Sequence, residues 1–204
     1  MNEQIIQPQQ LPATDRRGPF LIVGLGNPGR QYEHNRHNTG FMVLNRLSVK
    51  LGDSFSQVQS KALLAKTTFH GERVILVKPQ TYMNRSGMAV SSLVHFYEVL
   101  LENVLVVYDD VDLPVGTLRL RPSGGSAGQK GMQSIIERLG SEEIPRLRIG
   151  TGRPSGKQEA ADYVLKDFPS GVQDLLNETL DRAVEAILTF LQLGLDQAMN
   201  AYNG

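Results

Sequence analysis

Short apolar runs alternate along the chain with longer stretches in which apolar positions recur every three or four residues. The short runs, rich in β-branched residues, predict strands, and the longer stretches predict helices. The expected strands cover Phe20–Leu25, Ala62–Phe69, Val74–Val77, Val104–Tyr108, Thr117–Leu120 and Leu147–Ile149. The expected helices cover Thr39–Leu51, Ser86–Val99, Gln129–Leu139 and Val172–Tyr202. This alternation predicts an α/β protein with a mixed sheet surrounded by helices, and the neighbouring strands within 62–77 predict a hairpin.

The length of 204 residues, without a long linker, predicts a single domain over residues 20–204. Residues 1–19 are rich in Gln and Pro and lack an apolar segment, which favours a disordered tail over a signal peptide. No apolar run approaches the length of a membrane span, so we expect no membrane partner. The chain has no cysteine, which suits a cytoplasmic protein. The segment Gly150–Lys157 is a candidate surface loop or lid.

A glycine turn follows the first expected strand, where Gly24, Gly26 and Gly29 spell G-x-G-x-x-G. The turn fits three interpretations: a dinucleotide-binding loop, a purely structural turn, or one wall of a hydrolytic site. A dinucleotide loop opens directly into a helix, whereas Asn27-Pro28 interrupts this turn and the helical pattern starts later. That interpretation is therefore disfavoured. The Asn27 amide both donates and accepts, which suits a polar substrate.

A histidine and an aspartate lie at positions where they can meet. His37 directly precedes an expected helix, whose positive end disfavours an imidazolium and keeps the ring able to accept a proton. Asp109 follows a buried-type strand, and its carboxylate is placed to orient a histidine through the other ring nitrogen. The alternatives are a capping or solvent-exposed histidine, an acidic turn, and a cation site made with Asp110 and Asp112. The cation site is the least favoured of these.

The sequence Gly124–Gly128 contains G-x-S-x-G, which is typical of serine hydrolases. All four histidines precede Ser126, and no apolar strand leads into it, so we reject a serine nucleophile. A flexible loop that leads into a helix, whose N–H groups suit an anion such as phosphate, fits better. Residues 116–160 carry 8 Lys/Arg against 4 Asp/Glu, although the whole chain is neutral. This local charge fits either an anionic ligand or ordinary solvated surface.

Motifs with a shared order and spacing occupy Gly24–Gly29, Tyr32, Arg36–Gly40, Lys78–Gly87, Tyr108–Pro114, Gly116, Gly124–Gly131 and Arg146–Gly150. Together they resemble the bacterial-type peptidyl-tRNA hydrolase family. The resemblance implies a single α/β domain with a twisted mixed sheet. It also implies a monomeric enzyme that cleaves the ester between a peptide and the terminal ribose of tRNA, without a cofactor or metal. Its partners are then the peptide and the tRNA acceptor stem.

The resemblance also implies roles for individual residues. His37 matches the catalytic base and Asp109 the acid that orients it. Asn27 and Asn84 match the substrate-binding amides, and Met83 and Tyr32 match residues that line the same cleft. From the residues alone, Met83 and Asn84 fit equally a turn with methionine in the core.

One pair departs from the family pattern. The family commonly has His-Asn where this chain has Gln129-Lys130. Gln129 is expected to keep a hydrogen bond to substrate, and Lys130 to contact phosphate, to stabilise an oxyanion or to face solvent. The departure leaves open an alternative function, a catalytically impaired relative that only binds RNA. Retention of His37 and Asp109 argues for the enzyme.

Overall fold

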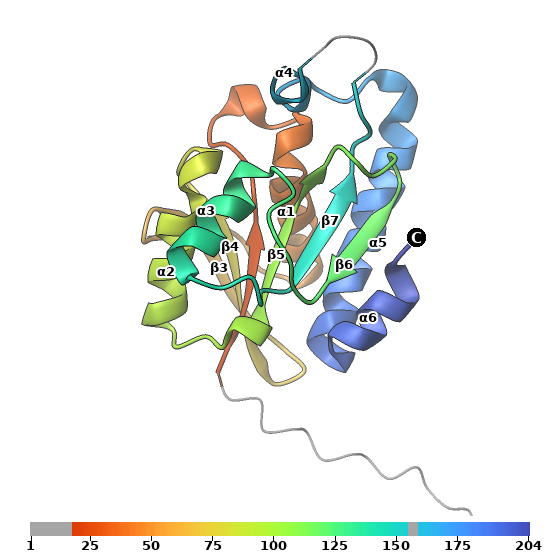
Figure 1. The fold of residues 1–204 in the computed structure, drawn as a ribbon. Coiled ribbons are helices and arrows are strands. Elements are labelled where there is room, and N and C mark those ends of the chain that lie inside the picture. Colours follow the sequence, from red (N-terminus) through yellow and green to blue (C-terminus); the bar gives the residue numbers. More distant parts are fainter. Residues whose placement is uncertain (1–17, 155–158) are drawn as a thin grey trace, which may run out of the picture.

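The computed structural model describes residues 18–154 and 159–204, and at its centre lies a seven-stranded mixed sheet (Figure 1). The strands are β1 (Phe20–Gly24), β2 (Gln57–Gln59), β3 (Ala62–Phe69), β4 (Glu72–Pro79), β5 (Val104–Asp110), β6 (Leu118–Arg121) and β7 (Arg146–Gly150). They lie in the order β2-β3-β4-β1-β5-β7-β6. β4, β1, β5 and β7 are parallel, whereas β2, β3 and β6 are antiparallel to their neighbours. The predicted fold class and the β3–β4 hairpin are confirmed.

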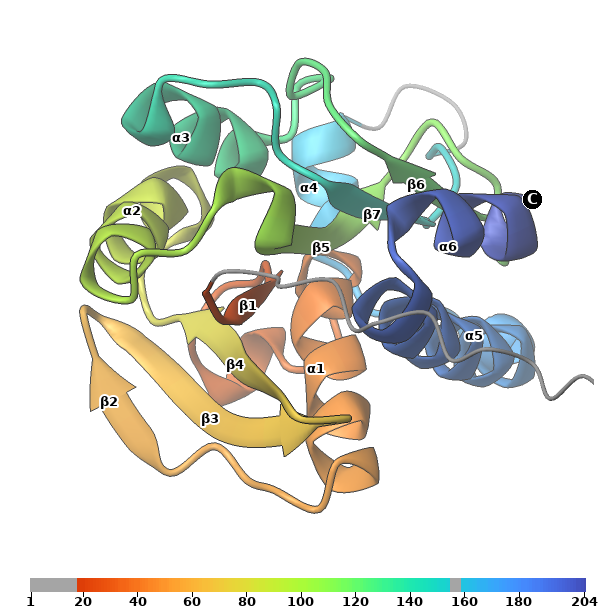
Figure 2. The same cartoon turned by 90° about the horizontal axis from the view of Figure 1, so that it is seen from below.

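Helices cover both faces of the sheet (Figure 2). The helices are α1 (Thr39–Lys50), α2 (Ser86–Phe96), α3 (Lys130–Leu139), α4 (Ala160–Val164), α5 (Gln173–Leu193) and α6 (Leu195–Tyr202). The 3₁₀ turns are η1 (Arg30–Tyr32), η2 (Arg36–Asn38), η3 (Met83–Arg85), η4 (Leu101–Asn103) and η5 (Ser170–Val172). One core cluster joins the sheet to α1, α5 and α6, and a second joins its other face to α2 and α3. Within the described parts of the chain, no helix is both long enough and apolar enough to cross a membrane.

The first strand shows why its sequence is a continuous apolar run. Successive residues of a strand point to opposite faces. Phe20 and Ile22 belong to the core under α1 and α5, whereas Leu21 and Val23 belong to the core under α2 and α3. Because β1 lies between two parallel strands of a sheet that is covered on both faces, both sets must be apolar.

The structure corrects the prediction of one helix over Val172–Tyr202. That region contains two helices, α5 and α6, separated by Gly194 with φ 89° and ψ 174°, a backbone conformation open to glycine. The short elements β2 and α4 were not predicted. The expected disordered tail falls outside the described residues except for Gly18 and Pro19, and the expected loop is described only up to Pro154.

The first turn of α1 lies directly against the backbones of β1 and β5. A Cβ added at Gly40 would lie 2.3 Å from the Val107 carbonyl oxygen and 2.5 Å from the Leu25 nitrogen. A Cβ at Gly24 would lie 2.4 Å from the Gly40 carbonyl oxygen. Only glycine permits this approach, which fixes where the turn before α1 meets the strand ends.

We therefore predict that Gly40→Ala lowers the free energy of unfolding by about 3 kcal/mol, because the new methyl group meets backbone that cannot move aside. Urea denaturation measures the change. Gly171→Ala is the matched control, since a Cβ there meets no atom within 4 Å. It should change stability by less than about 0.5 kcal/mol. Equal unfolding midpoints for wild type and Gly40→Ala would contradict the close approach.

Candidate active site

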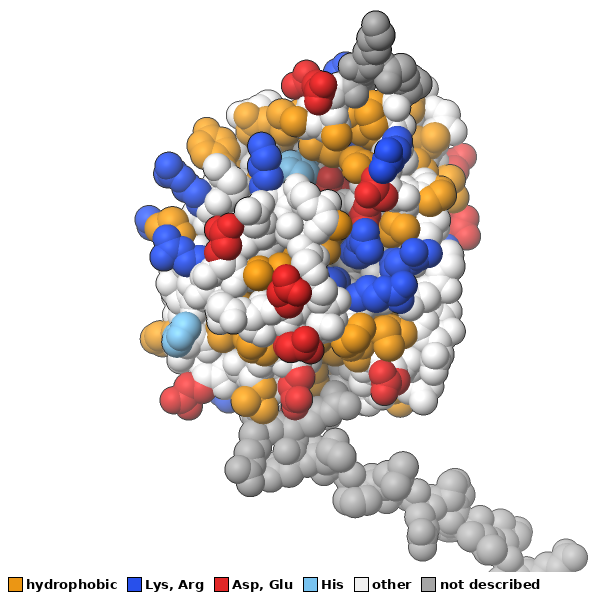
Figure 3. All heavy atoms as spheres, viewed as in Figure 1, with side chains coloured by type: hydrophobic (Ala, Val, Ile, Leu, Met, Phe, Trp, Pro, Cys, Tyr) orange, Lys and Arg blue, Asp and Glu red, His pale blue; other side chains and the backbone are white. Residues whose placement is uncertain are grey.

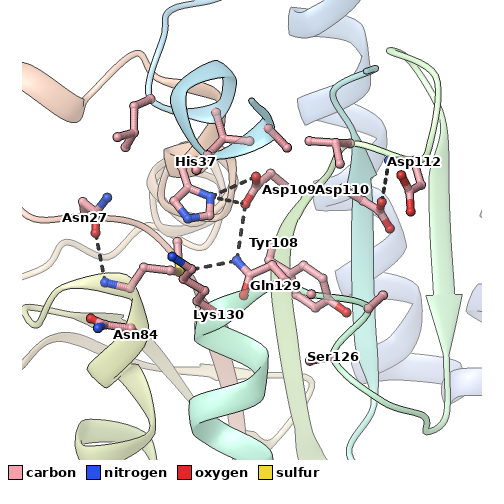
Figure 4. A pocket seen from close by; sticks show the side chains of 18 of the residues that line it. Asn27, His37, Asn84, Tyr108, Asp109, Asp110, Asp112, Ser126, Gln129 and Lys130 are labelled. Carbon is pink, nitrogen blue, oxygen red and sulfur yellow. Dashed lines mark hydrogen bonds and ion pairs between the residues drawn. The ribbon is translucent and has the colours of Figure 1, made fainter. Parts of the chain in front are cut away.

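A cleft of about 480 Å³ lies at the carboxyl ends of β1 and β5 (Figure 4). This edge is where parallel α/β sheets gather ligand-binding groups. η2, η3, α3 and α4 contribute the other walls. The lining residues are Asn27, His37, Tyr82, Met83, Asn84, Tyr108, Asp109, Asp110, Val111, Asp112, Ser126, Ala127, Gly128, Gln129, Lys130, Ala160, Ala161, Val164 and Leu165.

His37 and Asp109 are in direct contact in this cleft. Nδ1 of His37 lies 2.9 Å from each carboxylate oxygen of Asp109. Since an ionised carboxylate only accepts hydrogen bonds, Nδ1 carries the proton and Nε2 keeps its lone pair. Nε2 faces the cleft (Figure 4), and the His37 side chain is 14% exposed whereas that of Asp109 is 3% exposed. The pair thus presents a histidine nitrogen that can accept a proton, backed by a buried acid.

The backbone beside His37 is held by a buried arginine. Arg36 donates to the carbonyls of Lys166 (3.0 Å) and Asp167 (2.8 Å), just beyond α4. Its guanidinium also lies 4.0 Å from the ring centroid of Tyr163 in α4. These contacts tie the turn that carries His37 to the segment that forms one rim of the cleft. No pattern in the sequence predicts this role of Arg36.

The Asn27 amide has a fixed orientation. The side chain of Asn38 accepts from the Asn27 backbone nitrogen (2.8 Å) and donates to its carbonyl (2.9 Å). The Asn27 Oδ1 in turn accepts from the backbone nitrogen of Met83 (2.9 Å). Because the oxygen is engaged, the NH₂ group of Asn27 is the end available to a ligand. The clamping role of Asn38 was not predicted.

The three acids at and just after the end of β5 have three different partners. Successive strand residues point to opposite faces, so Asp109 turns toward His37 while Asp110 shares a face with Arg148. Asp110 forms an ion pair with Arg148, and Asp112 forms one with Arg153. Within residues 18–154 and 159–204, no three His, Cys, Asp or Glu side chains form a group that could hold a metal ion.

The remaining predicted site residues fall into two groups. Met83 is buried in the cleft wall, Asn84 and Lys130 are exposed on it, and Gln129 is half-buried beside Asp109. Tyr32 does not line this cleft and lies half-buried in η1. Its substrate contact stays a prediction.

A buried arginine shapes the loop before α3. Arg146 is 2% exposed and donates to the carbonyls of Gly124, Gly125, Glu142 and Ile144. Burial lowers the pKa of the Arg146 guanidinium and raises the pKa of the Tyr108 phenol next to it, with Arg146 and Arg148 partly opposing the shift at Tyr108. The Tyr108 hydroxyl therefore stays protonated in the cleft wall.

Basic side chains gather beside the cleft, over β6 and β7 (Figure 3). We call Arg119, Arg121 and Arg148 the arginine face. Leu118 and Leu120 alternate with the two arginines of β6 and are buried in the core on the other side of the sheet. Arg119 lies directly opposite Arg148 in the β6–β7 pairing. This face suits an extended polyanion.

Fold and site together define an α/β protein with a His–Asp pair facing an oriented amide, an arrangement suited to hydrolysis by an activated water. A profile of the family "Peptidyl-tRNA hydrolase" matches residues 21–204. The chain belongs to the peptidyl-tRNA hydrolase family.

Relatives with that name support the assignment. The chain is 48% identical to a protein of Caldanaerobacter subterraneus subsp. tengcongensis, over 91% of this chain and all of the relative. It is 46% identical to a chloroplastic protein of Arabidopsis thaliana, over 96% of this chain and 70% of the relative. The crystal structure of the enzyme from Acinetobacter baumannii matches with a TM-score of 0.85 at 35% identity, over 91% of this chain and 96% of that one.

The two hydrogen bonds between the Asn38 side chain and the Asn27 backbone can be tested by substitution. Asn38→Ala removes two hydrogen bonds and leaves both backbone polar groups of buried Asn27 unpaired. We expect a loss of about 2–3 kcal/mol in unfolding free energy, measured by urea denaturation. Exposed Asn84 is the control, and Asn84→Ala should change stability by less than about 0.5 kcal/mol. Similar losses of stability at both positions would show that Asn38 does not hold the Asn27 backbone.

Proposed function

We propose that this chain hydrolyses the ester bond between the peptide and the tRNA in peptidyl-tRNA and so returns free tRNA. The observation that carries the proposal is the 2.9 Å contact between His37 Nδ1 and Asp109 in a cleft. Family membership and the like-named relatives support the choice of substrate. The alternative of an RNA-binding relative without hydrolysis gains no support from the comparisons.

In the proposed reaction, His37 Nε2 takes a proton from a water molecule, whose oxygen attacks the ester carbonyl. Asp109 holds the ring in the required tautomer and stabilises the imidazolium as it forms. When the tetrahedral intermediate collapses, the bond to the ribose oxygen breaks and His37 returns the proton to that oxygen. A ribose hydroxyl is a better leaving group than an amine, so one activated water suffices, without a covalent intermediate or a cofactor.

Asn27 is better prepared than Asn84 to stabilise the oxyanion. Its oxygen is already bound to Met83 N–H, so its NH₂ group keeps one orientation before substrate arrives. Donors that are oriented in advance contribute most to such stabilisation. Asn84 is exposed on the same side of the cleft as Asn27 (Figure 4) and suits contact with the peptide or the terminal ribose.

The cleft binds the peptide end of the substrate, and the arginine face binds its tRNA end. Met83, Val164 and Leu165 offer apolar contacts for the peptide end. The arginine face holds phosphates of the acceptor stem, with Lys130 at the cleft mouth as a further cation. We infer that the protein acts as a monomer in the cytoplasm, which its lack of cysteine suits.

The catalytic pair can be tested by following peptide release from an N-acetylated aminoacyl-tRNA. His37→Ala and Asp109→Asn should each lower kcat by about 10³-fold, because one removes the base and the other its orientation. Asp109→Asn should keep its affinity for tRNA. His95→Ala removes an exposed histidine on α2 and should retain the wild-type rate within about twofold. Wild-type rates in His37→Ala would refute the mechanism.

The arginine face can be tested by the salt dependence of tRNA binding. Arg121→Gln should weaken binding and make the slope of log affinity against log salt shallower by about 1, because one phosphate contact is lost. Arg73→Gln, an exposed arginine on β4 near the other edge of the sheet, should leave the slope unchanged. Equal slopes for wild type and Arg121→Gln would place the acceptor stem elsewhere.

A further inference from the structure

Gln129 is the residue before α3, and its side-chain oxygen caps this helix. Oε1 accepts from the backbone nitrogen of Met132 at 2.8 Å, which satisfies one of the N–H groups left unpaired at a helix start. The two ends of an amide are easily confused, but only oxygen can accept here. The contact therefore fixes which way the amide points.

The NH₂ end of the same side chain points at the acid of the catalytic pair. Nε2 lies 3.4 Å from Asp109 Oδ1 and 3.4 Å from the Met83 sulfur (Figure 4). Asp109 Oδ1 also accepts from His37, so the three side chains form a chain from η2 through β5 to α3. A buried carboxylate needs donors on more than one side to keep its orientation.

We propose that Gln129 is a positioning residue for the hydrolysis, which acts through Asp109 rather than on the substrate. The inference rests on the proposed function. Gln129 joins the rigid start of α3 to the carboxylate that orients His37, so the angle between that carboxylate and the imidazole is set from two sides. Because both NH₂ hydrogens already have protein partners, we assign Gln129 this role in place of the expected hydrogen bond to substrate.

The charged groups around the pair determine what a new charge at position 129 would do. Lys130 lies next to Gln129 on α3, while Asp110 and Asp112 come from β5 and the turn after it. Each of these two acids has an arginine partner. A carboxylate at 129 would lie beside Asp109 without such a partner, and it would favour the protonated form of His37.

Two substitutions separate positioning from helix capping. Gln129→Ser keeps a good helix cap but is too short to reach Asp109. Gln129→Glu keeps an acceptor for Met132 N–H and replaces the donor by a carboxylate. Gln133→Glu is the control, since it adds the same charge on the exposed side of α3.

We expect Gln129→Ser to lower kcat about tenfold with KM changed less than twofold, and to unfold within a few degrees of wild type. In Gln129→Glu, the acidic limb of the rate–pH profile and the NMR titration of the His37 ring should both move to higher pH by about one unit. Gln133→Glu should leave both unchanged.

Two results would overturn the proposal: a rise in KM alone in Gln129→Ser, or an unshifted His37 titration in Gln129→Glu. The NMR titration requires no turnover. A shifted titration in a protein whose wild type releases no peptide would uphold the contact and refute the proposed function instead.

Discussion

The close approach of Gly40 to the backbones of β1 and β5 is the constraint on which the site depends. It brings the first turn of α1 within backbone contact of Val107 and Leu25. The residues just before that turn then lie level with the carboxyl ends of both strands. His37 reaches Asp109, 72 positions later in the chain, and Asn38 reaches the backbone of Asn27. A larger side chain at Gly40 would separate all of these groups together.

The polar groups of the site are oriented by the protein before any substrate binds. Asp109 decides which nitrogen of His37 carries the proton, and Met83 N–H decides which end of Asn27 faces the cleft. In each case, a group that can only accept or only donate fixes a partner that can do both. This orientation matters for catalysis, because groups that need not reorganise stabilise a transition state more effectively.

The sequence predicts the fold class and the meeting of His37 with Asp109, because strand ends in a parallel sheet share one edge. It does not predict α4, whose five residues are too few to show a helical period. The break at Gly194 is missed because apolar positions continue on both sides of it. The role of Asn38 is missed because a buried amide and an exposed one look alike in a polar run, and only the packing of Gly40 buries this one.

The arginine face destabilises the sheet through repulsion between its own charges. Arg119 and Arg148 are directly opposed on neighbouring strands, where like charges destabilise a sheet. The ion pair of Arg148 with Asp110, which points away from His37 on the other face of β5, offsets part of this repulsion. Among the described residues, Arg119 and Arg121 have no such acidic partner. Under the proposed function, phosphates bound at this face would relieve that repulsion without engaging Asp109, the partner of His37.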